Sequence, residues 1–166
     1  GRPFFELTRH ERLDLRLTQV SNKPIDKIEA YLQMKIDRKD FILFKKGVNK
    51  IDSEIDYSNK NYAVIFKKNH DLLMIEIPFD NIKEHRYEHD EFVEYTLRVM
   101  DDSSANPSIQ FKKAKECSIN KMFLEEAIRV LEENNSSFLP FFNIESQYFN
   151  VVYKNGRHYE VAVPAF

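Results

Sequence analysis

The stretch from Tyr62 to Phe79, YAVIFKKNHDLLMIEIPF, is the most apolar uninterrupted pattern in the chain and restricts its fold most strongly. Residues 62–66 and 72–77 are rich in β-branched and aromatic side chains, and the five residues between them favour a turn or face solvent. This pattern predicts a β-hairpin. Both arms are apolar at nearly every position instead of alternating, so we expect both faces of the hairpin to be covered.

The length and composition predict one folded domain over residues 1–166. A chain of 166 residues can bury a substantial core, and 42% hydrophobic residues with three glycines indicate a globular protein. The chain begins with Gly1 instead of methionine, which predicts that it is a fragment of a larger protein.

Charge and cysteine content limit the classes of partner and compartment. The net charge of -2 provides no overall field that would attract nucleic acid or an anionic membrane, so any basic surface must be local. Cys117 is the single cysteine, which fits a reducing intracellular compartment, cytoplasmic or nuclear. The sequence has no apolar run long enough to predict a membrane span.

The remaining pattern predicts an α+β protein. A helix is indicated from Pro24 to Asp37, and another from Ser118 or Asn120 to Glu133. Asn155-Gly156 is a strong hairpin signal. Further strands are expected at 4–8, 13–20, 41–44, 93–99, 109–111, 141–144, 148–153 and 159–163. Tight turns between strands favour a mostly antiparallel sheet or a small barrel with two amphipathic helices, and no fixed-period repeat of the solenoid kind is found.

The order of elements between residues 41 and 134 resembles a known family. The segment Ile77-Pro78-Phe79-Asp80-Asn81-Ile82, the strands at 94–99 and 109–111, and the helix from Ser118 resemble the final part of a pleckstrin-homology-like domain, with the polo-box pattern as a near alternative. The chain departs from both by a ββα segment before this core and by additional β-hairpins at 138–166. The resemblance implies a scaffold that binds protein partners or phospholipid head groups.

Three predicted strands end in the same tripeptide, Phe-Lys-Lys. If these ends lie on one edge of a sheet, their ammonium groups converge and attract an acidic or phosphorylated segment of a partner protein. The predicted partner-binding residues are Lys45, Lys46, Lys67, Lys68, Lys112 and Lys113. The alternative is that lysines at strand ends protect sheet edges and bind nothing.

Two other classes of function remain open. A nucleic-acid-binding module would use the same lysines with aromatic stacking. A metal-dependent hydrolase would use Glu76 with Asp71 and Asp80, or the motif His85-Arg86-Tyr87-Glu88-His89, which matches H-x-x-E-H. That motif lies in a continuously charged stretch, so we expect no catalytic site, no metal and no cofactor.

The C-terminal third is unusually aromatic. Its aromatic residues include Phe138, Phe141, Phe142, Tyr148, Phe149, Tyr153 and Tyr159. Because a small core has limited room for such side chains, a homodimer or partner interface on these strands is a further expectation.

Overall fold

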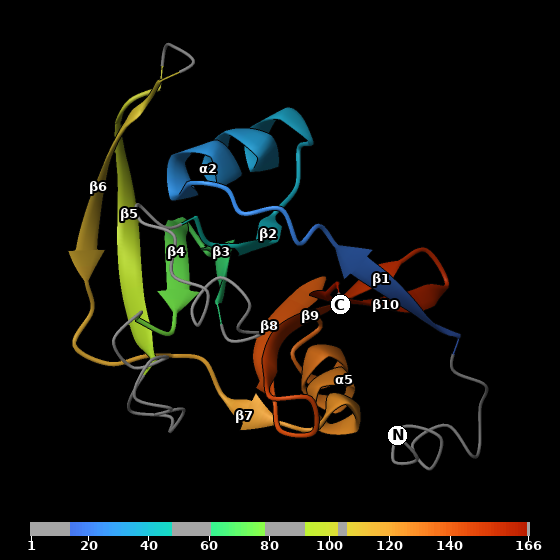
Figure 1. Ribbon diagram of the computed structural model, residues 1–166. Helices are drawn as coiled ribbons and strands as arrows, with labels where there is room; N and C mark the ends of the chain where they lie inside the picture. The colour runs from blue at the N-terminus through green and yellow to red at the C-terminus, as the bar shows by residue number, and fades with distance from the viewer. Residues whose placement is uncertain (1–13, 48–60, 79–91, 103–105, 166) are drawn as a thin grey trace.

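The computed structural model describes residues 14–47, 61–78, 92–102 and 106–165 (Figure 1). The elements are β1 (Leu15–Val20), α2 (Lys27–Ile36), β2 (Phe41–Lys45), β3 (Tyr62–Lys68), β4 (Asp71–Glu76), β5 (Val93–Asp101), β6 (Ser108–Lys113), β7 (Lys121–Met122), α5 (Leu124–Glu133), β8 (Phe138–Asn143), β9 (Tyr148–Asn155) and β10 (His158–Pro164). The strand predicted at 4–8 lies outside the described residues, as do Asp80 and the motif from His85 to His89.

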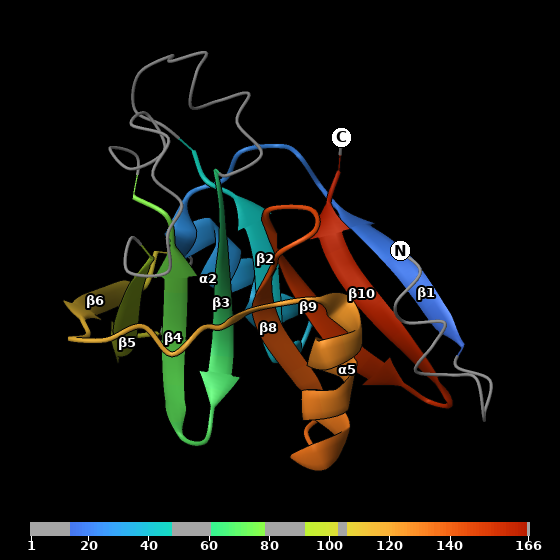
Figure 2. The same ribbon diagram turned by 90° about the horizontal axis from the view of Figure 1, so that it is seen from below.

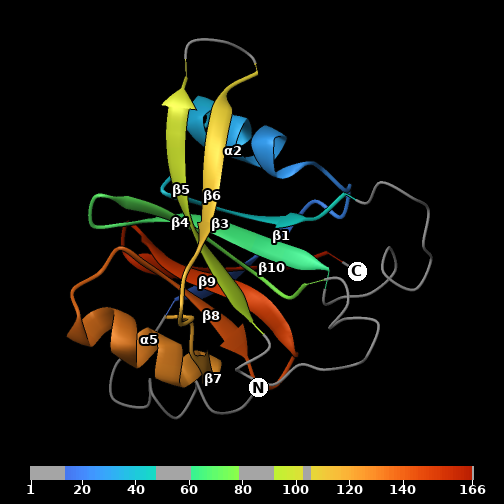
Figure 3. The same ribbon diagram turned by 90° about the vertical axis from the view of Figure 1, so that its left-hand side faces the viewer.

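The described elements form four layers. Figures 1 and 3 show α2 on one outer side, α5 on the other, and two sheets packed against each other between them. The first sheet has the strand order β2-β3-β4-β5-β6, and the second has the order β1-β10-β9-β8-β7. These orders confirm the predicted α+β class with two helices and mostly antiparallel sheets.

Parallel pairing occurs only at the edges of the second sheet, among the described strands. β1 runs parallel to β10, and the two-residue β7 runs parallel to β8. Figure 2 shows β1 beside β10, on the opposite side of the molecule from β5 and β6. The N-terminal strand therefore completes a sheet made by the C-terminal third of the chain.

The predicted central hairpin is β3–β4, and its two faces pack against different layers. The five residues from Tyr62 to Phe66 are all buried. Ala63 and Ile65 belong to a cluster with Ala30 and Met34 of α2, whereas Val64 packs in the cluster between the sheets. The hairpin is thus apolar at nearly every position because both of its faces are covered, as expected from the sequence.

Each helix packs on its sheet through one alanine and two larger side chains. α2 buries Ala30, Tyr31 and Met34, and its N-cap Asp26 accepts a hydrogen bond from the Ile28 backbone N–H. α5 buries Ala127, Ile128 and Leu131. The start predicted for the second helix at Ser118 or Asn120 is wrong, because the following Lys121 and Met122 pair with β8 as β7.

The layer between the sheets is rich in aromatic rings. Phe142 of β8 and Phe149 of β9 pack edge to face with centroids 5.4 Å apart, and Phe92 packs against both rings. Phe41 of β2 reaches across to Phe138 of β8, with centroids 5.3 Å apart. Many of the aromatic side chains of the C-terminal third therefore pack in the core between the sheets.

The Phe142→Ala substitution should lower the free energy of unfolding by about 3–5 kcal/mol, because it opens a cavity beside the rings of Phe92 and Phe149 at a fully buried position. Equilibrium urea unfolding measures this loss. The Met100→Ala control, at a residue 59% exposed, should stay within about 0.5 kcal/mol of the wild type. Similar losses in both variants would contradict the burial of this layer.

Candidate functional site

The structure does not bring the six predicted lysines together on one surface. Because β2 and β3 are antiparallel, Lys45 at the end of β2 lies opposite Tyr62 at the start of β3, at the far end from Lys67. Lys112 lies on β6, and strands β4 and β5 separate it from β3. The expected convergence does not occur, because β3 runs opposite to β2 and β6, and β2 and β6 lie at opposite edges of the sheet.

Lys46, which was predicted to bind a partner, instead has a structural role. Its side chain is buried, and its Nζ donates hydrogen bonds to Glu76 Oε1 at 2.7 Å and to the Ile77 backbone oxygen at 2.8 Å. Burial lowers the pKa of Lys46, and the neighbouring Glu76 carboxylate opposes that shift. Lys46 therefore links β2 to β4 and is not exposed to a partner.

The other lysines are more accessible. Lys67 forms an ion pair of 3.7 Å with Asp40, while Lys68, Lys112 and Lys113 are exposed. A role for these residues in partner binding remains a prediction.

The residues considered for metal chemistry form no metal site in the described part of the chain. Glu76 is engaged by Lys46, and Asp71 is exposed at the start of β4. No group of three or more His, Cys, Asp or Glu side chains with metal-binding geometry occurs among the described residues. Cys117 is partly buried, and burial raises the pKa of its thiol, so the described surroundings do not activate it.

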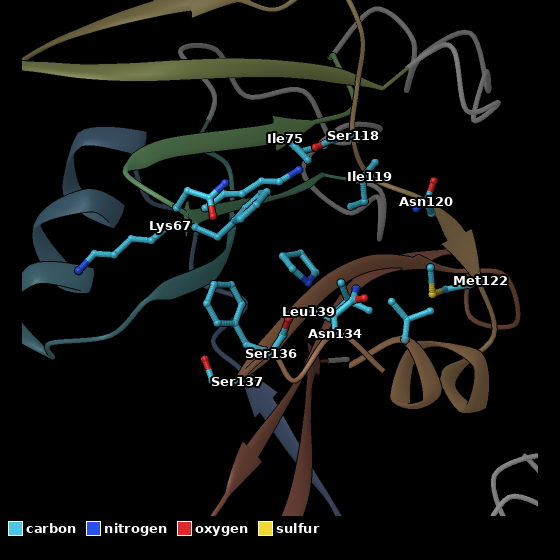
Figure 4. A pocket seen from close by; sticks show the side chains of 16 residues that line it. Lys67, Ile75, Ser118, Ile119, Asn120, Met122, Asn134, Ser136, Ser137 and Leu139 are labelled. Atoms are coloured by element: carbon cyan, nitrogen blue, oxygen red, sulfur yellow. The ribbon is translucent and has the colours of Figure 1, made fainter. Parts of the chain in front are cut away.

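A groove of about 500 Å³ lies between the tip of hairpin β3–β4 and the segment that runs from Ser118 through α5 to β8 (Figure 4). Its floor is apolar, with Phe66, Ile75, Ile119, Met122, Val130, Phe138, Leu139 and Pro140. The polar lining consists of hydroxyl, amide and ammonium groups without a carboxylate: Lys67, Lys68, Asn69, Ser118, Asn120, Asn134, Ser136 and Ser137. The groove can therefore offer hydrogen bonds and positive charge to a polar ligand.

Local backbone structure sets the positions of these polar groups. After α5, Asn135 adopts a left-handed conformation with φ of 49°, and the Ser136 N–H donates to the Leu131 carbonyl. This turn places Ser136 and Ser137 at the groove. Across it, Glu94 of β5 accepts hydrogen bonds from the backbone N–H and the hydroxyl of Ser118.

The two lysines at the groove differ in direction. Successive side chains of a strand point to opposite faces, and Phe66 faces the layer between the sheets. Lys68 shares that face, whereas Lys67 runs toward α2 in Figure 4 and pairs with Asp40. Lys68 is thus the sequence-predicted lysine best placed to serve the groove.

In a comparison with known protein families, one segment of the chain matches a family model. Residues 110–159 match the family model described as "Sigma 54 modulation/S30EA ribosomal protein C terminus". The matched segment begins in β6, contains α5, β8 and β9, and ends in β10. It covers less than a third of the chain, and it contributes every groove residue from Ser118 to Pro140. A comparison with curated proteins gives no match.

This match corrects the predicted family and the function derived from it. The resemblance to a pleckstrin-homology-like or polo-box domain is wrong, because α5 belongs to a ribosomal-protein-like segment that continues through β8 and β9. An order of antiparallel strands followed by a helix occurs in many folds, so it could not distinguish these families. The predicted module for an acidic or phosphorylated protein partner is overturned by the same finding.

The groove itself was missed by sequence reasoning. Five of its polar residues are serines and asparagines that flank α5, where these residue types are common for reasons of backbone geometry alone. Across the described residues, no helix has the length and apolarity needed to cross a membrane.

The Lys46→Met substitution should lower the free energy of unfolding by about 3 kcal/mol, because it leaves the mostly buried Glu76 carboxylate without its cation. Chemical denaturation measures this effect. The double variant Lys46→Met/Glu76→Leu should recover most of the loss, since it removes both charges. A double variant as unstable as the single one would argue against the pair as the cause.

Proposed function

We propose that this chain is a non-catalytic, ribosome-associated protein and that the matched segment carries its binding surface. The observation behind the proposal is the match of residues 110–159 to a ribosomal protein C terminus. The matched residues pair with one another in β8–β9 and bury Ala127, Ile128 and Leu131 of α5. They thus form a coherent structural unit rather than a scattered similarity.

The chemistry of the groove supports ribosomal RNA as the contacted component. Protein contacts to nucleic acid backbones use lysine, serine and asparagine side chains together with backbone N–H groups. The groove carries these side chains, and no Asp or Glu, which would repel phosphate, is among its described lining residues; Glu94 accepts hydrogen bonds from Ser118 but does not line the groove. Lys68 supplies the charge, while Ser136, Ser137 and Asn134 supply neutral hydrogen bonds. Association with ribosomes would place the protein in the cytoplasm.

The wild-type chain should sediment with ribosomes in a sucrose gradient, and the Lys68→Glu variant should bind about tenfold more weakly. The reason is the replacement of an attractive contact with phosphate by a repulsive one. The matched control is Lys154→Glu on β9, an exposed lysine that lines a different cavity which also contains Asp37 and Asp40. The control should bind like the wild type.

Salt dependence gives the experiment a second measurement. Binding through phosphate contacts weakens steeply as the salt concentration rises, and Lys68→Glu should flatten that dependence. Absence of the wild-type chain from the ribosomal fractions at low salt would contradict ribosome association. Equal losses in Lys68→Glu and Lys154→Glu would leave ribosome association in place and contradict the groove as its site.

A further inference from the structure

The two helices of the fold occupy equivalent places in the sequence and the structure. Adding 97 to the bounds of α2, Lys27–Ile36, gives the bounds of α5, Leu124–Glu133. The same difference relates the two left-handed residues that follow the helices, Arg38 and Asn135. It also relates two parallel bridges, from Ile25 to Lys46 and from Met122 to Asn143.

The hairpins that follow the helices are equivalent as well. Here the difference in residue number is 87, because ten more residues lie between Lys45 and Tyr62 than between their equivalents, Phe142 and Phe149. Phe41 lies opposite Phe66 in one half, and the equivalent Phe138 lies opposite Tyr153 in the other.

The second strand pair of each half has the same register and the same turn. Val64 is paired with Ile75, and the equivalent Val151 is paired with Ala162. Both turns contain a residue with positive φ at the same place, Asn69 or Gly156. A shift by one residue would exchange the two faces of a strand, so the shared registers place equivalent side chains on equivalent faces.

Each half also has an equivalent helix-to-sheet core. In the first half, Ala30, Met34 and Phe44 pack with Ile65. In the second half, the residues at the equivalent positions are Ala127, Leu131, Phe141 and Val152, and they form one cluster. The shared order of a helix and three antiparallel strands, with the same registers and the same core positions, is more than two unrelated αβββ segments would have in common.

We infer that the described residues between 15 and 76 are a second copy of the structural unit formed by residues 108–164, and that the two copies pair with each other inside one chain. The first copy consists of β1, α2, β2, β3 and β4. The second consists of β6, β7, α5, β8, β9 and β10, and β5 connects the copies. The family model matches the second copy alone.

The contact between the copies has the reciprocal geometry of a two-fold interface. Phe41 packs against Phe138, its own equivalent, with ring centroids 5.3 Å apart. Phe41 also packs against Tyr153 of the second copy, and the equivalent pair, Phe138 and Phe66, lines the groove together. In a symmetric dimer, such reciprocal contacts arise because each partner presents the same surface.

Each copy also contributes a strand to the sheet of the other, but the two strands are not equivalent, because β1 pairs directly with β10 whereas β6 pairs with β5. β1 of the first copy pairs with β10, the last strand of the second copy. β6 of the second copy joins the sheet of the first copy, where β5 connects it to β4. Figure 1 shows β1 beside β10 and β6 beside β5, at opposite ends of the molecule.

This arrangement identifies the partner for the apolar inner face of each sheet. The faces that carry Val64 and Ile75 in one copy and Phe142 and Phe149 in the other are fully buried against each other. A unit with one copy would expose its face and would require a second chain to cover it. Here the other half of the same chain covers it, so the protein is a monomer with the internal architecture of a dimer.

Concentration dependence tests the pairing within one chain. Light scattering should give the mass of a single chain, 19.8 kDa, and the thermal midpoint should not change over a hundredfold range of protein concentration. A mass of twice this value, or a midpoint that rises with concentration, would show that the faces pair between chains. Neither measurement involves ribosomes, so its failure is separable from failure of the proposed function.

A cysteine pair tests the exchanged strand. Gln19 of β1 and Val163 of β10 are direct neighbours in the sheet, so the full chain with Gln19→Cys, Val163→Cys and Cys117→Ser should form a disulfide on oxidation. The product should run as a monomer on a non-reducing gel. The control, Gln19→Cys with Cys117→Ser, can cross-link only between chains and should remain uncross-linked. A covalent dimer, or no disulfide in the double-cysteine variant, would overturn the exchange.

Discussion

The apolar layer between the two sheets is the constraint on which the rest of the structure depends. Each sheet covers its outer face with a helix, but the inner faces are too apolar to remain in water and must cover each other. Phe41 and Phe138 meet across this layer. The exchanged strand β1 extends the second sheet beside β10, and the groove lies where the two sheets diverge around Phe66 and Phe138. The layer thus determines both the arrangement of the copies and the position of the candidate site.

Local sequence patterns predicted the elements better than their arrangement. The apolar arms at 62–66 and 72–77, the strand expected at 13–20, of which residues 15–20 form β1, and the Asn155-Gly156 turn identified strands correctly, because each signal depends on neighbouring residues. The duplication was not recognisable from a fixed period, because the first copy has a longer connection between β2 and β3. Equivalent positions also hold different residues, such as Ile65 and Val152, that preserve volume and face without preserving identity.

The candidate site was less accessible to sequence reasoning. Three Phe-Lys-Lys endings suggested one surface, but strand direction separates Lys45 from Lys67, and Lys46 is buried beside Glu76. Whether a lysine is exposed or neutralised depends on residues distant in the sequence. The same holds for the groove, which Lys68 lines together with the serines after α5. Of the six lysines, Lys67 and Lys68 line the groove, and Lys68 shares the face of its strand with Phe66. The family match added what the pattern alone lacked, a similarity of residues 110–159 to the C terminus of a ribosomal protein family.

Joining two copies in one chain allows them to become chemically different. The counterpart of the groove is a cavity of about 470 Å³ where Asp37 and Asp40 occupy the positions of Asn134 and Ser137. A dimer of identical chains must present every site twice, whereas this chain can change one site and retain the other. The polar lining of one cavity has carboxylates and that of the other does not. The two halves related by the pseudo-two-fold axis therefore differ in the charge of their cavities. This difference favours one orientation on an asymmetric partner and a stoichiometry of one site per chain.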